Sequence, residues 1–269
     1  MPHRAPIGIF DSGLGGLTIL KALRRALPAE DFVFVGDLAH LPYGDKSSAS
    51  IRYYSDRIVR WLVEVHQVKG VVIACNSASA SAAHYLRQRW GQHVPIVDVI
   101  DPMVDEVICR QDIRTVGVIG TRRTVRSGAY QRRFQLRAPH LHVKARATPL
   151  LAPMIEEGFF NNNISRTILR NYLPFQWTHS LDVLILGCTH YPLIRDEIRE
   201  VLAPTVTIID STQVIPGVVR RQVNPNDPLP NRTGEMHIFV TEWSDAFRKS
   251  LNVFMGGYHH PTILKLWET

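Results

Sequence analysis

The chain has 269 residues, which is enough for one large domain or two small ones around a sizeable hydrophobic core. Hydrophobic residues make up 45% of it and charged residues 20%, as in ordinary globular proteins, and no apolar stretch approaches the ~20 residues that span a bilayer. The first strand-like run, Ile7–Phe10, is too short for the core of a secretion signal. We therefore expect a cytoplasmic protein with no membrane contact.

The formal net charge of +7 favours small anions as ligands. The basic residues are scattered, and the two densest groups fit the start and the exposed face of one helix (Arg122, Arg123 and Arg126; Arg132, Arg133 and Arg137). A nucleic-acid surface is better indicated by a concentrated basic run with interleaved aromatic residues. We expect no nucleic-acid partner, although a regulator that binds through this basic surface stays an alternative.

Short β-branched runs alternate with helical patterns along the chain, which predicts an α/β fold with mostly parallel sheets. The predicted strands are Ile7–Phe10, Phe32–Gly36, Gly70–Ala74, Pro95–Val97, Val116–Ile119, His142–Ala145, Val183–Leu186, Val206–Ile209 and His237–Thr241. The predicted helices are Leu17–Leu27, Ser50–Gln67, Ser79–Trp90, Pro102–Cys109, Ser127–Leu136, Ile194–Leu202 and Trp243–Phe254. The polar, proline-rich segment Gly217–Arg232 is predicted to be a loop.

An internal repeat is the most informative feature of the sequence. Four landmarks recur in the same order at offsets of 109 to 113 residues: Ile7-Gly8-Ile9 with Val116-Gly117-Val118, Pro42 with Pro153, Val72–Cys75 with Ile185–Cys188, and Val97-Asp98 with Ile209-Asp210. We expect two pseudo-symmetric α/β units that face each other across a cleft, formed by residues 1–98 plus 211–269 and by residues 99–210.

Ligands of open α/β sheets lie beyond the carboxyl ends of the strands, which selects the loops after the strands. The first loop, Asp11–Gly16, is rich in glycine, but it does not match G-x-G-x-x-G, and Asp11 places a negative charge where a pyrophosphate would sit. The glycines instead fit a tight turn into the next helix. A nucleotide site is therefore not expected here.

Two of the three cysteines, Cys75 and Cys188, end equivalent strands of the repeat and precede predicted helices. A helix N-terminus stabilises a thiolate, and lowering a thiol pKa by ~1.5 from ~8.5 makes half of it thiolate at pH 7, for about 2 kcal/mol. The third, Cys109, lies within a predicted helix, and we assign it a structural role. Three cysteines do not make a disulfide framework.

Two acid/base groups that face one centre suit racemisation, in which one removes an α-proton and the other returns a proton on the opposite face. Each needs a partner that tunes its proton. Asp11 is the candidate beside Cys75, and His190 and Glu156 are the candidates beside Cys188. Small polar residues in the same loops suit a carboxylate or zwitterionic substrate; they are Ser12, Asn76, Ser77, Thr121, Thr124 and Thr189.

These segments resemble the aspartate/glutamate racemase family, and most closely its glutamate racemases, from about residue 7 to 212. The segments that carry the resemblance are Gly8–Gly16, Pro42-Tyr43-Gly44, Ala74–Ala80, Gly120-Thr121 with Thr124, Ser127 and Tyr130, Pro153–Glu156 and Leu186–Leu193. The family usually has Thr where this chain has Ser77, which keeps the hydroxyl, and the match loosens after Asp210-Ser211.

The resemblance implies a cofactor-independent enzyme, often a homodimer, that supplies D-glutamate for peptidoglycan. It implies that Cys75, helped by Asp11, removes the α-proton of D-glutamate, and that Cys188, helped by His190 with Glu156 nearby, acts on L-glutamate. It also implies the residues that bind glutamate: Asp11, Ser12, Tyr43, Gly44, Asn76, Ser77, Thr121, Thr189 and His190.

Several alternatives stay open at this point. An aspartate racemase of the same group would use the same residues on a shorter substrate. A mixed metal site would use Asp11, Cys75, Cys188 and His190, although the paired local ligands of structural zinc sites are missing. A redox protein would join Cys75 to Cys188 in a disulfide.

Overall fold

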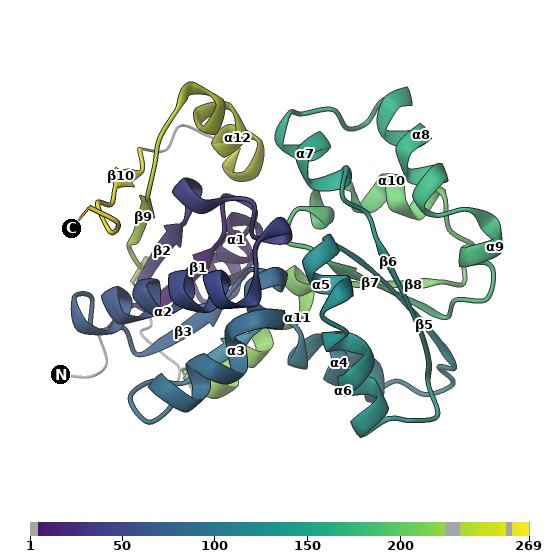
Figure 1. The fold of residues 1–269 in the computed structure, drawn as a ribbon, viewed down its shortest axis with the longest axis horizontal. Helices are drawn as coiled ribbons and strands as arrows, with labels where there is room; N and C mark the ends of the chain where they lie inside the picture. Colours follow the sequence, from purple (N-terminus) through teal and green to yellow (C-terminus); the bar gives the residue numbers. More distant parts are fainter. Residues whose placement is uncertain (1–4, 224–231, 257–259, 269) are drawn as a thin grey trace.

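The computed structural model describes residues 5–223, 232–256 and 260–268. They form two parallel sheets with helices on both faces, which confirms the predicted fold class (Figure 1). The six-stranded sheet has the order β10 (Thr262–Ile263), β9 (Met236–Val240), β2 (Phe32–Gly36), β1 (Ile7–Asp11), β3 (Gly70–Ile73) and β4 (Ile96–Asp98). The four-stranded sheet has the order β6 (His142–Ala147), β5 (Thr115–Gly120), β7 (Val183–Gly187) and β8 (Thr207–Asp210).

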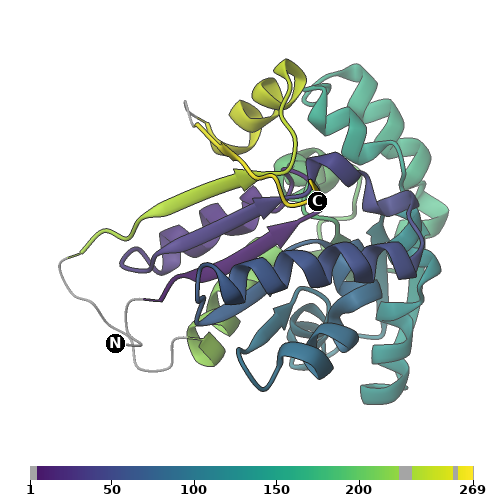
Figure 2. The same ribbon diagram turned by 60° about the vertical axis from the view of Figure 1, so that its left-hand side comes forward.

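The repeat in the sequence corresponds to a repeat in topology. The order β2-β1-β3-β4 in one sheet matches β6-β5-β7-β8 in the other, and every pairing in both is parallel. The last strands of the two sets, β4 and β8, also end alike, at Asp98 and Asp210. Each of these carboxylates accepts one hydrogen bond from a backbone N–H that follows it and one from an arginine side chain. Figure 2 shows β1, β2 and β9 running side by side in one direction, so their carboxyl ends share one edge.

Helices cover both faces of each sheet, so every residue of the central strands β1, β2, β3 and β7 is buried. The α-helices are α1 (Leu17–Ala26), α2 (Ser48–Glu64), α3 (Asn76–Trp90), α4 (Asp101–Ile108), α5 (Arg122–Arg126), α6 (Ala129–Arg137), α7 (Leu151–Glu156), α8 (Asn163–Tyr172), α9 (Phe175–Thr178), α10 (Arg195–Glu200), α11 (Ser211–Val223) and α12 (Asp245–Met255). The described residues also form the short 3₁₀ helices η2 (Leu38–His40), η3 (Tyr43–Asp45) and η4 (Tyr191–Ile194).

One hydrophobic core runs through both halves of the molecule. It joins Ile9 of β1 and Leu17 of α1 to Leu186 of β7 and Ile198 of α10. Two further clusters fill the space under α2 and α3 in one half and under α4 and α6 in the other. The two sheets are therefore held by continuous packing, and α12 and α7 face each other across the top of Figure 1, where Ser250 donates a hydrogen bond to the carbonyl of Glu156.

Three helix predictions were wrong in their detail. The predicted helix Ser127–Leu136 begins only at Ala129, as α6, because Gly128 in the left-handed conformation (φ +62°) separates it from α5, a short helix that was not predicted. The predicted helix Ile194–Leu202 is the shorter α10, and Ile194 is the last residue of η4. Helix α3 begins at Asn76 instead of Ser79, so Cys75 is its N-cap residue.

The predicted loop Gly217–Arg232 was also wrong over its first part. Residues up to Val223 continue α11, which packs against α1 even though Pro216 lies inside it. The part of the predicted loop at 224–231 lies outside the described residues. None of the helices in residues 5–223, 232–256 and 260–268 is long and apolar enough to cross a bilayer.

Candidate active site

A cavity of about 270 Å³ lies where loops at the carboxyl ends of the two sheets meet. It is lined by both predicted catalytic cysteines and by residues that follow β1, β3, β5, β6 and β7. The lining residues are Ser12, Gly13, Leu41, Pro42, Tyr43, Gly44, Asp45, Cys75, Asn76, Ser77, Thr121, Arg122, Thr148, Pro149, Ala152, Pro153, Glu156, Cys188, Thr189, His190 and Tyr191. All the residues predicted to act in catalysis or substrate binding line it, except Asp11 and Thr124.

Cys75 reaches the cavity from the N-terminus of α3. Its Sγ accepts the backbone N–H of Ala78 at 3.4 Å and donates to Ser12 Oγ at 3.5 Å. Burial, and secondly the carboxylate of Asp11, raises the pKa of the Cys75 thiol to about 12. The expectation of a lowered pKa at this helix N-terminus was therefore wrong. Loss of hydration and a nearby negative charge outweigh the helix N–H group, so Cys75 is a thiol at neutral pH.

Asp11 ends β1 and lies behind the cavity wall, where it is almost fully buried. Its Oδ2 accepts the backbone N–H of Gly13 at 3.1 Å, whereas its Oδ1 accepts no hydrogen bond from the described residues. Burial raises the pKa of Asp11, although the charge of His190 and the hydrogen bonds from Gly16 and Gly13 act in the opposite direction. The structure thus places Asp11 beside Cys75, as predicted, but not in the cavity lining.

Cys188 follows β7 and has a different partner. Its Sγ lies 3.6 Å from Nδ1 of His190, whose Nε2 lies 2.8 Å from Oε1 of Glu156. Burial alone would lower the pKa of His190, but Cys188 and Glu156 raise it well above its ordinary value. The ring is therefore held as an imidazolium between a sulfur and a carboxylate, and Phe254 of α12 packs edge-on against it. Only the 3₁₀ helix η4 follows Cys188, so the predicted helix N-terminus is missing on this side.

Polar groups connect the two halves beside the thiols. Ser77 Oγ of α3 lies 2.9 Å from Oγ1 of Thr121, the residue that follows β5 and caps α5. Asn76 Oδ1 accepts the hydroxyl of Tyr130 at 2.9 Å, while its buried Nδ2 has no hydrogen-bond partner among the described residues. A buried donor without a partner costs free energy. The Nδ2 group of Asn76 is therefore available for an oxygen of a ligand in the cavity.

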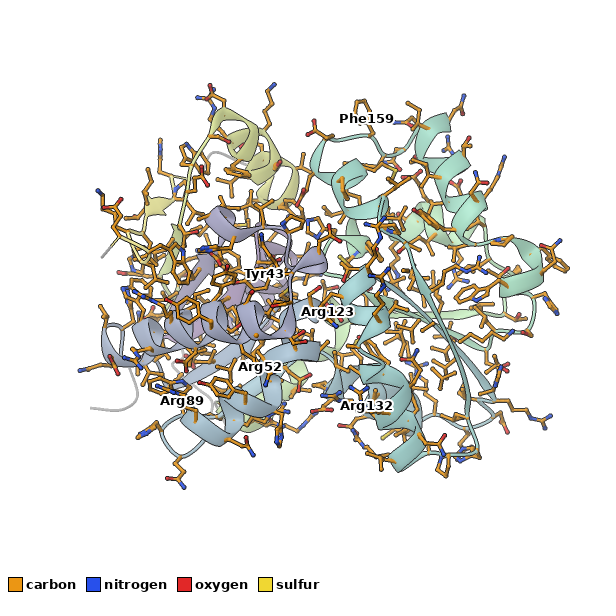
Figure 3. The ribbon with its side chains drawn as sticks, viewed as in Figure 1. Tyr43, Arg52, Arg89, Arg123, Arg132 and Phe159 are labelled. Carbon is orange, nitrogen blue, oxygen red and sulfur yellow. The ribbon has the colours of Figure 1, made fainter. Side chains whose placement is uncertain are left out.

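Tyr43, which with Gly44 forms one wall of the cavity, is held from behind by Asp37. The Tyr43 hydroxyl donates to Asp37 Oδ2 at 2.6 Å, and Asp37 is completely buried. The same carboxylate accepts Thr241 Oγ1 at 2.9 Å and Trp267 Nε1 at 3.0 Å. Segments from the N-terminal and C-terminal parts of the chain thus converge on one carboxylate and fix the orientation of Tyr43 (labelled in Figure 3).

Sequence reasoning gave no role to two groups that the structure brings to the site. Thr148 Oγ1 and Tyr191 OH lie 2.7 Å apart and both line the cavity. Strand β6 was predicted to end at Ala145 but runs to Ala147. Thr148 therefore directly follows a strand, as do the candidate residues in the other loops. Asp37 directly follows β2, but its link to Tyr43 depends on tertiary packing.

The three cysteines of the chain are free thiols, and Cys109 is exposed at the end of α4, away from this cavity. In the part of the chain that the structure describes, no three His, Cys, Asp or Glu side chains gather closely enough to hold a metal ion. The local chemistry is that of two thiols with separate acid–base partners.

Comparison with known proteins agrees with this arrangement. Residues 7–215 match the family model described as Asp/Glu/Hydantoin racemase. The chain is 39% identical over 259 residues to a glutamate racemase of Geobacter metallireducens, covering 96% of this chain and 94% of the relative. It is 40% identical to the glutamate racemase of Thermus thermophilus, covering 91% and 90% of the two chains.

Solved structures give the same result. The glutamate racemase of Francisella tularensis, solved in complex with D-glutamate, superposes with a TM-score of 0.89 at 34% identity over 99% of both chains. An aspartate racemase of Picrophilus torridus is more distant, with a TM-score of 0.56 at 16% identity over 81% of this chain and 94% of the other, and shares the fold alone. The chain therefore belongs to the aspartate/glutamate racemase family and, within it, to the glutamate racemases.

Proposed function

We propose that Cys75 and Cys188 are the two acid/base groups with which this amino-acid racemase interconverts L- and D-glutamate. The supporting observation is that both thiols follow equivalent strands of the repeated topology, β3 and β7, and line one cavity, with Asp11 beside Cys75 and His190 beside Cys188. A cavity of about 270 Å³ is below the roughly 300–1,000 Å³ of pockets for drug-sized ligands, and it suits a small amino acid.

The two thiols have different surroundings before substrate binds. Cys75, with its pKa raised to about 12, is a thiol that donates to Ser12. Cys188 lies 3.6 Å from Nδ1 of the His190 imidazolium, which is placed to exchange a proton with it. By the family resemblance, we assign Cys188 as the base and Cys75 as the acid in the form of the enzyme that accepts L-glutamate.

In the forward step, the α-C–H bond of L-glutamate breaks and its proton passes to Cys188 Sγ, while the electron pair stays on the α-carbon. A new C–H bond then forms on the opposite face with the proton of Cys75 Sγ. The product is D-glutamate, and the enzyme is left with a Cys75 thiolate and a Cys188 thiol. Exchange of these protons with solvent restores the first form, and D-glutamate reacts with the second.

The form with a Cys75 thiolate must be stabilised by other groups. At pH 8, forming this thiolate costs about 5 kcal/mol when the pKa of Cys75 is about 12. The substrate supplies part of this free energy, because its positively charged ammonium group attracts the negative charges of Asp11 and the Cys75 thiolate. Asp11 and Ser12 on this side, and Glu156 and His190 on the other, are the proton-tuning groups. We assign the substrate carboxylates to the donors of Ser12, Asn76, Ser77, Thr121 and Thr189, with Tyr43 and Gly44 as the facing wall.

Deuterium incorporation at the α-carbon in D₂O tests this proposal. Wild type should racemise glutamate without an added cofactor and incorporate solvent deuterium in both enantiomers. Cys75→Ala and Cys188→Ala should each lose racemisation while keeping the wild-type circular dichroism spectrum. A single variant that still racemises at a wild-type rate would sink the two-thiol mechanism, and racemisation of aspartate alone would move the chain to the aspartate-specific branch.

We also propose three properties that rest on the family resemblance. The working units are residues 1–98 plus 211–269 and residues 99–210, a division supported by the two separate sheets. The enzyme acts in the cytoplasm, where its D-glutamate enters peptidoglycan synthesis. It forms a homodimer, which light scattering on the purified protein checks, since a monomer mass across the working concentration range would contradict it.

A further inference from the structure

The carboxylates and cations that line the active-site cavity form two pairs of opposite charge. Glu156 and the imidazolium of His190 make the pair that serves Cys188. Asp45 and Arg122 make the other pair, in which Oδ1 of Asp45 lies 3.5 Å from Nη1 of Arg122. Arg122 is the only lysine or arginine among the described residues that line this cavity, and the proton transfers do not use it.

This second pair bridges the two halves of the protein at the rim of the cavity. Asp45 ends η3, directly after Gly44. Arg122 begins α5, directly after Thr121, and this helix lies at the boundary between the halves in Figure 1. The two backbones approach closely there, because a Cβ atom at Gly44 would lie 3.2 Å from Cβ of Thr121. The side chains of Asp45 and Arg122 are 60% and 48% exposed, so they face solvent as well as the cavity.

The geometry of the pair lets Arg122 change partners. The separation of 3.5 Å is longer than a charge-assisted hydrogen bond, and neither side chain has a further hydrogen-bond or ion-pair partner among the described residues. Ion pairs that are this exposed contribute little to stability. A carboxylate that enters the cavity from solvent therefore displaces Asp45 from Arg122 at little cost in free energy.

The charge of the substrate gives the two side chains opposite effects. Glutamate at neutral pH carries two carboxylates and one ammonium group, so it is an anion. Arg122 attracts this anion toward the cavity, whereas Asp45 repels it. Counterions screen exposed charges, so both effects weaken as the ionic strength rises.

We propose that Arg122 is a specificity-determining residue that favours anionic amino acids at the mouth of the cavity, and that Asp45 is its exchangeable partner. A carboxylate of the entering substrate takes the place of Asp45 on Arg122, and Asp45 returns when the product leaves. The inference rests on the proposed use of this cavity for glutamate. A pair that only joined the two halves would not give opposite changes in substrate affinity when each member is neutralised.

Steady-state kinetics with both enantiomers test this proposal at an ionic strength of about 10 mM, where the Debye length is about 30 Å. Arg122→Gln should raise the KM for glutamate about 3- to 5-fold, and Asp45→Asn should lower it about 2-fold, with kcat within about 2-fold of wild type in each. The KM of the double variant should lie between those of the single variants. All these differences should become smaller than about 1.5-fold at 1 M, where the Debye length is about 3 Å.

The matched controls are Arg126→Gln and Glu64→Gln. Arg126 is exposed on the same helix as Arg122, Glu64 is exposed at the end of α2, and neither lines the cavity. Both controls should keep the wild-type KM, and equal shifts in them would mean a general effect of net charge and would overturn the proposal.

Two further results would also overturn it: an unchanged KM in Arg122→Gln, or a KM that rises in both Arg122→Gln and Asp45→Asn, since the pair would then only join the halves. A wild type that does not racemise glutamate would instead contradict the proposed function, and this inference with it.

Discussion

Trp267 donates its indole N–H to the carboxylate of Asp37 at 3.0 Å, across 230 residues of sequence. The same carboxylate accepts the hydroxyl of Tyr43, which lines the active-site cavity. The ring of Trp267 also meets the edge of His40, whose Nδ1 lies 3.0 Å from Asp37. The C-terminal segment is thus connected to the wall of the active site through a single buried carboxylate.

Trp267→Phe keeps most of the ring packing but removes the hydrogen bond to Asp37. Hydrogen bonds to charged groups contribute about 1.5–3 kcal/mol, and Trp267 is half-buried, so we expect a loss of about 1.5 kcal/mol in the free energy of unfolding and a few-fold fall in kcat/KM. Urea denaturation and racemisation kinetics measure the two effects. Trp243→Phe is the control, since the indole of Trp243 makes no hydrogen bond with the residues that the structure describes, and equal losses in both variants would count against the link.

Glu156→Gln should lower kcat/KM by about 10- to 100-fold, because it removes the charged partner that holds His190 as an imidazolium beside Cys188. The enantiomers have equal free energies, so kcat/KM must fall by the same factor in both directions. The alkaline limb of the pH profile should also move to lower pH, since the raised pKa of His190 loses one of its causes. Glu157→Gln changes the exposed neighbouring carboxylate, and it should leave the rate and the profile unchanged.

Thr121→Val keeps the shape of the side chain and removes its hydrogen bonds to Ser77 and Thr124. Each neutral hydrogen bond contributes about 0.5–1.5 kcal/mol, so we expect the KM for glutamate to rise about 3- to 10-fold. Steady-state kinetics with either enantiomer measure this. The same change at the exposed Thr167 of α8 provides the comparison, and an unchanged KM in Thr121→Val would show that the contact does not contribute to substrate binding.

Asp101→Asn should lower the free energy of unfolding at neutral pH, and this difference from wild type should vanish in acid. Burial opposes ionisation of Asp101, but hydrogen bonding with Asp98 and the guanidinium groups of Arg133 and Arg87 lower its pKa from 3.8 to about 2. A carboxylate whose pKa is lower in the folded than in the unfolded state stabilises the fold above about pH 4, and this contribution is lost as the pH falls toward 2. The wild-type advantage should be about 2 kcal/mol at pH 7.

Denaturation midpoints of wild type and Asp101→Asn, measured from pH 7 down to pH 2.5, give the size of this effect. The two curves should converge as Asp101 is protonated. Glu64→Gln, at an exposed position on α2, should run parallel to wild type throughout. A constant gap between wild type and Asp101→Asn over the whole range would show that the carboxylate stabilises the fold by some means other than its charge.

Strands and the positions of the two thiols were predictable from the sequence, because apolar runs bounded by glycine and polar residues mark buried parallel strands. Cys75 and Cys188 then followed from the repeat. The break at Gly128 was not predictable, because a glycine inside a helical pattern looks the same whether the helix continues or turns. Helix α11 was missed because Pro216 suggested a loop, yet Val218, Val219 and Val223 pack well enough to continue the helix.

Acid–base properties were less predictable than positions. Sequence reasoning placed Cys75 at a helix N-terminus and expected a lowered pKa, whereas the pKa is raised to about 12 because the thiol is buried beside Asp11. Burial is a property of the whole fold and cannot be read from neighbours in the sequence. For the same reason the hydrogen bond between Tyr43 and Asp37, and the contact of Trp267 with that carboxylate, appear only in the assembled structure.

The glycine-rich loop after β1 has a mechanical consequence. A Cβ atom at Gly15 would lie 2.4 Å from Thr189 Oγ1 and 2.5 Å from the His190 ring, and Thr18 at the start of α1 donates a hydrogen bond to the Thr189 carbonyl. The loop that begins one half of the protein is thus in direct contact with the loop that carries Cys188. Any movement that separates these loops to admit glutamate also withdraws Gly15 and Thr18 from the loop of Cys188, so opening of the site and the packing around its second thiol are linked.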